Sequence, residues 1–183
     1  MLNKFQKISY LGLIATLTLA PLNVMAQGFS DLDEYSPYFK SVSNFAALGI
    51  LKGFEDKTFQ PNQNVTRAEA VKILSLALDL EVNSERQNEL TFTDVPKNQW
   101  FYEYVDIALS HDLIKGFPDN TFRPAEPIQV AEMLKIAMKA KKIEIGSSTN
   151  TLSLAENAWY KDYANFALDK NFLSLVKFSK FFT

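Results

Sequence analysis

The sequence predicts an all-α protein made of helix-loop-helix repeats. The first observation is an internal repeat, because residues 29–80 recur without a gap as residues 92–143, at an offset of 63. The second is that each copy contains two stretches of apolar residues at helical spacing, separated by a loop of turn-forming residues. The third is the absence of cysteine, which leaves apolar burial between neighbouring units as the means of stabilising the fold.

Residues 1–26 have the order of segments found in a secretory signal peptide. Two lysines precede an apolar run, and small residues follow before Ala26. A membrane anchor is the alternative, but the run at 8–22 is shorter than the roughly 20 residues that a spanning helix needs, and it contains Pro21. We therefore expect export and cleavage after Ala26. The remaining chain has 17 basic and 21 acidic residues, and its net charge of −4 argues against a nucleic-acid partner.

The first helix of each repeat is predicted from its apolar stripe. In the second copy the stripe indicates an amphipathic helix from about residue 98 to residue 111. The matching apolar residues are Tyr38, Val42, Phe45 and Ala46 in the first copy and Phe101, Val105, Ala108 and Leu109 in the second. Pro37 stands where a first helical turn accepts proline.

The loops at 53–64 and 116–127 carry the glycine, aspartate, asparagine and proline that turns require. Gly53 and Gly116 are expected to adopt positive φ, and Asp56 and Asp119 are expected to form Asx turns. A calcium loop needs about six or more oxygen ligands in series, and neither loop supplies them, so no metal site is expected.

The second helix of the first repeat is predicted to begin after Thr66. Thr66 and Glu69 have the spacing of a capping box, which satisfies two backbone donors of the first helical turn. Arg67 is different, because a cation beside the positive end of a helix dipole is locally unfavourable. Arginine at a helix N-terminus can bind a carboxylate through its forked donors, so Arg67 is a candidate for anion binding. A salt bridge to a neighbouring repeat is the alternative.

A third, incomplete copy begins late in the chain. Trp159, Tyr160 and Tyr163 repeat Trp100, Phe101 and Tyr104 at an offset of 59, but no second loop and helix follow. The aromatic residues Phe172, Phe178, Phe181 and Phe182 complete the core in place of the missing helix, form a partner surface, or mark a truncated gene. We therefore expect a signal peptide at 1–26, repeats at 27–90 and 91–150, and a partial repeat at 151–183.

In their order and duplication, these motifs resemble the S-layer homology (SLH) family. The family's aromatic-x-Asp start, G-F-x-D-type loop and T-R-A-E helix start correspond to Phe29-x-Asp31, Gly53-Phe54-x-Asp56-x-Thr58-Phe59-x-Pro61 and Val65-Thr66-Arg67-Ala68-Glu69. The resemblance covers nearly the whole chain after residue 26. It implies a pseudo-threefold helical bundle at the cell surface, in the cell wall or S-layer, that anchors exported proteins to acidic, often pyruvylated, polysaccharide without catalysis.

By resemblance, Arg67 would contact the acidic sugar substituent, and Trp100, Asp31 and Asp94 would shape grooves between repeats. The second repeat departs from the pattern, since Gln129 and Val130 replace the capping threonine and the arginine. At most one groove should therefore have the complete set of motif residues.

Other interpretations of these residues stay open. Trp100 suits core packing as well as a sugar platform, and Asp31 and Asp94 suit helix caps or turn braces. His111 is the only histidine and the serines have no evident base partner, so we expect neither an enzyme nor a cofactor. The alternative function is a structural protein-protein interaction module of the envelope, with another SLH-bearing chain as partner.

Overall fold

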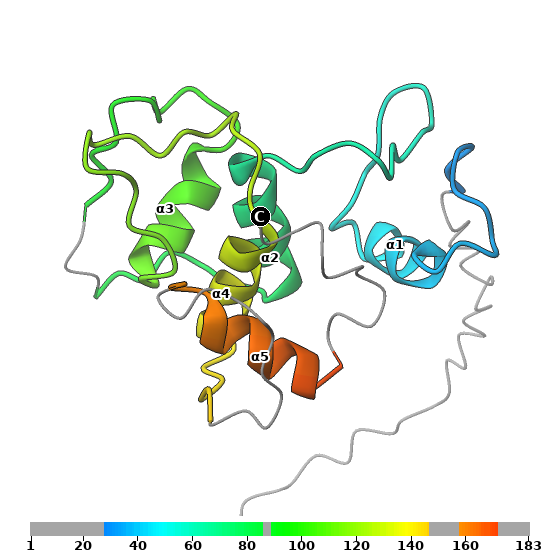
Figure 1. The fold of residues 1–183 in the computed structure, drawn as a ribbon. Helices are drawn as coiled ribbons and strands as arrows, with labels where there is room; N and C mark the ends of the chain where they lie inside the picture. Colours follow the sequence, from blue (N-terminus) through cyan, green and yellow to red (C-terminus); the bar gives the residue numbers. More distant parts are fainter. Residues whose placement is uncertain (1–27, 86–88, 147–157, 172–183) are drawn as a thin grey trace, which may run out of the picture.

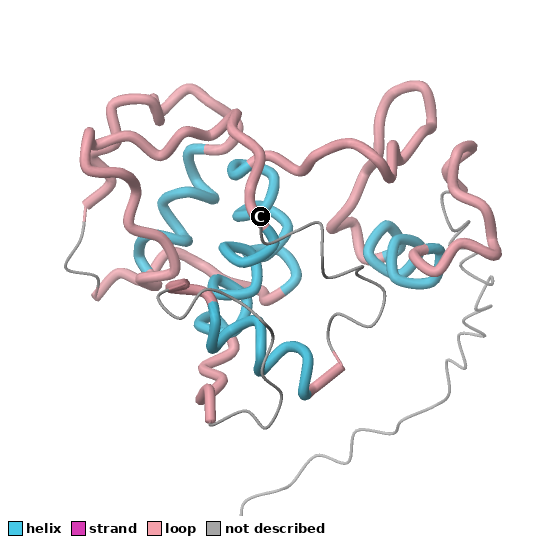
Figure 2. Tube along the Cα trace, in the orientation of Figure 1, coloured by secondary structure: helices cyan, strands magenta, loops and turns pink. Residues whose placement is uncertain are grey.

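The computed structural model describes residues 28–85, 89–146 and 158–171 (Figure 1). The predicted signal peptide and the aromatic residues after position 171 lie outside these residues. The described part contains five α-helices: α1 (Phe39–Ala47), α2 (Arg67–Ala77), α3 (Tyr102–Ser110), α4 (Val130–Ala140) and α5 (Lys161–Asp169). Within these ranges the sole extended pairing is an isolated bridge between Thr66 and Pro127, and long loops join the helices (Figure 2). The all-α prediction is confirmed.

The helices pair between repeats. The second helix of the first repeat, α2, packs on α3, the first helix of the next, and α4 packs on α5 in the same way. α1 has no comparable packing against another described helix and lies to one side in Figure 1. Each paired helix therefore depends on the neighbouring repeat to bury its apolar face, as repeat architectures require.

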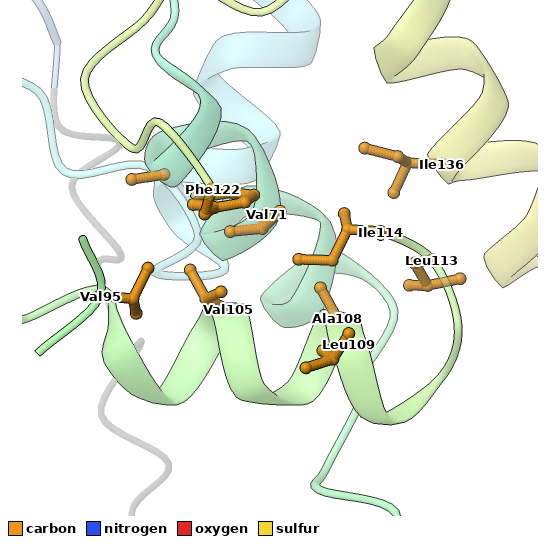
Figure 3. Close-up of a cluster of buried hydrophobic side chains, with 10 residues drawn as sticks. Val71, Val95, Val105, Ala108, Leu109, Leu113, Ile114, Phe122 and Ile136 are labelled. Carbon is orange, nitrogen blue, oxygen red and sulfur yellow. The ribbon is translucent and has the colours of Figure 1, made fainter. Parts of the chain in front are cut away.

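The main core lies at the junction of α2, α3 and the second loop (Figure 3). Val71 of α2, Val105 of α3 and Phe122 of the loop are almost fully buried. α1 has a smaller cluster of its own, formed with Phe29 and Leu32. The first repeat is thus divided, because its second helix belongs to the core of the second repeat.

α3 begins later than the apolar stripe predicts. The expected start is near residue 98, whereas the helix starts at Tyr102. The preceding residues form turns, in which the Gln99 amide donates to Pro96 O at 3.1 Å and the Tyr102 amide donates to Gln99 O at 3.0 Å. Trp100 consequently projects from a turn before the helix and is half-exposed.

The two loops form the same turn. In the first, the Phe54 amide donates to Thr58 O at 2.9 Å, and in the second the Phe117 amide donates to Thr121 O at 2.8 Å. Asp56 and Asp119 each accept from the threonine two residues later, the geometry of an Asx turn.

Glycine is required at the start of each turn. Gly116 has φ +70°, and a Cβ added there would lie 2.3 Å from Phe92 Cε1 and 2.9 Å from Thr121 O. The corresponding Cβ at Gly53 would lie 2.3 Å from Phe29 Cε1. The ring that closes over each glycine leaves no room for a side chain.

No described helix is long and apolar enough to cross a membrane.

Replacement of Gly116 by alanine tests this requirement. We expect Gly116→Ala to lower the free energy of unfolding by about 3 kcal/mol, because positive φ and a clash with Phe92 act together. Gly49→Ala is the matched control, since Gly49 has φ +72° with open space at its Cβ, and it should cost only about 1 kcal/mol. Urea unfolding measures both values. Equal losses would show that the contact with Phe92 contributes nothing.

Candidate functional site

A concave site lies between the first repeat and the start of the second. It has a volume of about 320 Å³ and is lined by the loop that follows α1, by one face of α2 and by Trp100. We call this site the inter-repeat groove. It exists because α2 packs on α3, which brings the turn that holds Trp100 against the helix of the preceding repeat.

The inter-repeat groove has an aromatic wall with a cation beside it. Lys72 of α2 places its Nζ 5.3 Å from the centre of the Trp100 ring and 5.9 Å from that of Tyr104. Trp100 also meets Phe101 edge-on, with ring centres 5.4 Å apart, and keeps 53 % of its surface exposed. The tryptophan is therefore held in place while much of its surface stays accessible.

The remaining polar groups of the groove are mostly basic or neutral. Lys52 lines it from the loop, together with the amides of Gln60, Gln63 and Asn64. Glu69 also lines the groove, but its Oε2 already accepts from the Thr66 amide and hydroxyl, both at 2.8 Å. Two lysines beside an exposed indole and several amides form a site suited to an anion that also has an apolar face.

Arg67 lies at the junction of the two repeats, where it is buried. Its Nε donates to Phe122 O at 2.9 Å and its Nη1 contacts Glu132 Oε1 at 2.6 Å. The guanidinium carbon also lies 4.9 Å from the Phe117 ring centre. Of the two interpretations of Arg67 from sequence, the structure shows the salt bridge to a neighbouring repeat.

The N-terminus of α2 is occupied by the second repeat. The Arg67 amide donates to Glu126 O at 2.9 Å, and the Ala68 amide donates to Pro124 O at 3.0 Å. Thr66 and Glu69 complete the capping box. Carbonyl oxygens and a carboxylate of the chain itself therefore take the place that an external anion would have at this helix end.

Asp31 and Asp94 hold the loops. Asp31 accepts from the Phe59 and Gln60 amides, both at 2.7 Å, and Asp94 accepts from the amides of Phe122 and Arg123 at 2.8 and 2.7 Å. Since Gln60 and Arg123 have φ of 57° and 60°, each aspartate stabilises a strained point of its loop. The hydrogen bond from the Phe59 amide is the main cause of a lowered pKa at Asp31.

The four residues that the sequence indicated for ligand binding thus have different positions. Trp100 lines the inter-repeat groove, whereas Arg67, Asp31 and Asp94 are not among its lining residues. Asp31 reaches the groove indirectly, because it fixes Phe59 and Gln60, which do line it.

Sequence reasoning missed the two lysines. Lys52 recurs as Lys115 and Lys72 recurs as Lys135, both at the offset of 63. This repetition was the signal in the sequence that could have identified them. Lys135 is also structurally equivalent to Lys72, since its Nζ lies 5.0 Å from the Trp159 ring centre. Trp159 is 51 % exposed and meets Tyr160 edge-on, as Trp100 meets Phe101.

The helix pairs and the groove between them define a helical repeat module with a concave surface at the repeat junction. The family model of the S-layer homology domain matches residues 28–71 and 91–134. The chain belongs to this family, and its two matched repeats agree with the resemblance seen in the motifs.

Its relatives are surface-layer and cell-wall proteins. The chain is 29% identical over 134 residues to a surface layer protein of Brevibacillus choshinensis, a match that covers 72% of the chain and 12% of the relative. It is 33% identical over 130 residues to a cellulosome-anchoring protein of Acetivibrio thermocellus, covering 68% and 29%. A third match, 28% over 164 residues, is to an uncharacterized cell wall amidase of Bacillus anthracis, covering 87% and 30%.

The chain thus spans less than a third of the length of each of these relatives. Family and relatives together identify it as a cell-surface, cell-wall-associated protein.

Removal of the Arg67 side chain should weaken the interaction between the two repeats. We expect Arg67→Ala to lower the free energy of unfolding by about 3–4 kcal/mol, because it leaves Glu132 partly buried without its cation. A double-mutant cycle with Glu132→Gln should show coupling of about 1–3 kcal/mol. Glu126→Gln, which removes an exposed partner of Arg123, is the control and should cost less than about 1 kcal/mol. Absence of coupling would contradict the junction role.

Acid should weaken the first loop through Asp31. Its pKa lies below the ordinary value of 3.8 in the folded chain, so its stabilising contribution is complete above that value and is lost as pH falls through the folded pKa. Asp31→Asn should therefore reduce the loss of stability between about pH 6 and about pH 3. Urea unfolding at both pH values measures this. Glu55→Gln, a change of an exposed carboxylate in the same loop, is the control, and an equal effect of both variants would contradict the assignment.

Proposed function

We propose that the chain is a non-catalytic anchoring module that binds acidic polysaccharide of the cell envelope in the inter-repeat groove. The observation that carries the proposal is the pair of Lys72 and Trp100, with Lys52 nearby, around an accessible concave surface. The names of the relatives support it, since one is a surface layer protein and another a cellulosome-anchoring protein.

The chemistry of the groove fits a sugar that carries a carboxylate. Sugar rings have apolar C–H faces that stack on an indole, and Trp100 offers such a face at the edge of the groove. The ammonium groups of Lys52 and Lys72 would pair with the carboxylate, for which a pyruvyl ketal is one source. The amides of Gln60, Gln63 and Asn64 would donate to and accept from hydroxyls.

Arg67 would serve this binding indirectly. It joins Phe122 O and Glu132 of the second repeat to the start of α2, and α2 also bears Lys72. Asp31 would also act indirectly, because it fixes the loop backbone at Phe59 and Gln60. Asp94 would fix the loop that Arg67 contacts. The proposal thus gives these residues positioning roles and gives direct contact to Trp100 and the two lysines.

The second repeat supports a second binding point on the same polymer. Lys135 and Trp159 repeat the geometry of Lys72 and Trp100, although Arg67 has no counterpart at Val130. A polysaccharide presents many identical sugars, so two weak sites on one chain would raise the overall affinity by effective concentration. Weak single contacts are therefore sufficient for anchoring.

Cosedimentation with purified wall polymer tests the proposal. Trp100→Ala and Lys72→Ala should each weaken binding about tenfold, because each removes a contact of about 1–2 kcal/mol with the sugar or its carboxylate. Circular dichroism should show unchanged helical content, since both side chains lie at the rim of the core.

Lys40→Ala, which removes an exposed lysine of α1, is the matched control and should bind as the unmodified chain does. Chemical removal of the acidic substituents from the polymer should reduce binding of the unmodified chain to the level of Lys72→Ala. Full binding by Trp100→Ala, or full binding to the neutralised polymer, would contradict the proposal.

A further inference from the structure

α1 exposes an apolar stripe that no described helix covers. Tyr38, Phe45 and Leu48 follow one another at helical spacing and are 46, 38 and 71 % exposed. Tyr35, one turn before the helix, is 87 % exposed. We call these four residues the α1 stripe. It lies beside the buried Val42, so the apolar face of α1 is wider than its own small core can cover.

The same face is a helix contact in the other repeats. Phe45 corresponds to Ala108 of α3, which is 2 % exposed in the core shared with α2, and to Ala167 of α5, which is fully buried against Met138 of α4. In α3 and α5 the second helix of the preceding repeat covers this face. No repeat precedes the first among the described residues, and one large side chain, Phe45, stands where the other two repeats have alanine.

The α1 stripe is complementary to itself. When two copies of α1 lie antiparallel about a two-fold axis between positions 41 and 42, Tyr38 of each copy falls opposite Phe45 of the other. The same axis brings together the two ends of the helix, where Tyr35 lies in the preceding turn and Leu48 is the C-cap. Ser41, the small residue in the middle, lies at the crossing and allows close approach of the two backbones. One register therefore pairs Tyr38 with Phe45 and brings the ends that carry Tyr35 and Leu48 near each other, as an isologous contact requires.

Charges favour the antiparallel orientation. Lys40 is the only charged residue of α1, and in this register it falls opposite Ser43, so the two lysines do not meet. The segment before α1 is acidic, with Asp33 and Glu34, and the segment after it carries Lys52. An antiparallel pair brings the acidic end of one copy toward the basic end of the other, and it opposes the two helix dipoles.

We infer that the α1 stripe is a homodimer contact, formed by two copies of this chain with their α1 helices antiparallel. With side chains of about 200 Å² each, the exposed fractions amount to about 500 Å² per copy, or about 1,000 Å² for the pair. Such an area is at the lower limit for a specific interface, so the dimer forms in a concentration-dependent manner. Two anchoring modules joined in this way present twice the number of grooves to a wall polymer.

Sedimentation velocity of the protein purified from an exporting host tests the contact. The unmodified chain should shift from monomer toward dimer between micromolar and submillimolar concentration. Phe45→Glu combined with Leu48→Glu should raise the dissociation constant more than about tenfold, with helical content unchanged. Val82→Glu is the matched control, because Val82 is also an exposed aliphatic residue, at 42 %, but lies outside the stripe.

Cysteine cross-linking tests the register independently of the glutamate variants. The chain has no cysteine, so Ser41→Cys introduces a single thiol next to the proposed axis. Mild oxidation should link most of the protein as a dimer, since a disulfide forms only where the two Cα atoms approach within about 7 Å. Ala47→Cys, at an exposed position of the same helix away from the stripe, should link far less.

Three outcomes would overturn the inference. A monomer at every concentration is the first, and equal cross-linking at positions 41 and 47 is the second. The third is an association that persists in the double glutamate variant and disappears when residues 172–183 are deleted, because that result assigns the contact to the C-terminal aromatic residues.

Discussion

The packing of one repeat's second helix on the next repeat's first helix is the contact on which the rest of the structure depends. Val71 of α2 and Val105 of α3 meet across the repeat boundary, and this contact buries the apolar faces of both helices. The same boundary brings Arg67 to Glu132 and Lys72 to Trp100. The core, the ion pair and the groove are thus three consequences of one packing geometry, and for this reason the groove lies between repeats.

The two cations Arg67 and Lys72 of α2 have different electrostatic environments. Arg67 is at the helix start, where the dipole opposes a positive charge, and the carbonyl oxygens of the second repeat together with Glu132 compensate for it. These interactions hold the guanidinium in the protein interior. Lys72 lies farther along α2, where its ammonium group faces Trp100 at the groove. In this arrangement Arg67 stabilises the junction between repeats and Lys72 lines the groove.

The differences between repeats follow from their position in the array. The first helices of the second and third repeats, α3 and α5, have alanine where α1 has Phe45, because a preceding helix packs there. α1 has an exposed apolar stripe instead.

Local features of this protein were determined by the sequence alone. The turns that begin at Gly53 and Gly116, the Asx turns and the capping box of Thr66 and Glu69 involve residues only a few positions apart, so their spacing is visible in the chain. The duplication is visible as well, because it appears when the chain is compared with itself. The tertiary structure alone decided which distant residues meet. Glu132 lies 65 positions from Arg67, and Phe59 lies 28 positions from Asp31. The sequence does not show whether the partner of a carboxylate or a cation is a ligand or another part of the chain. The partner depends on the helix packing that brings remote segments together.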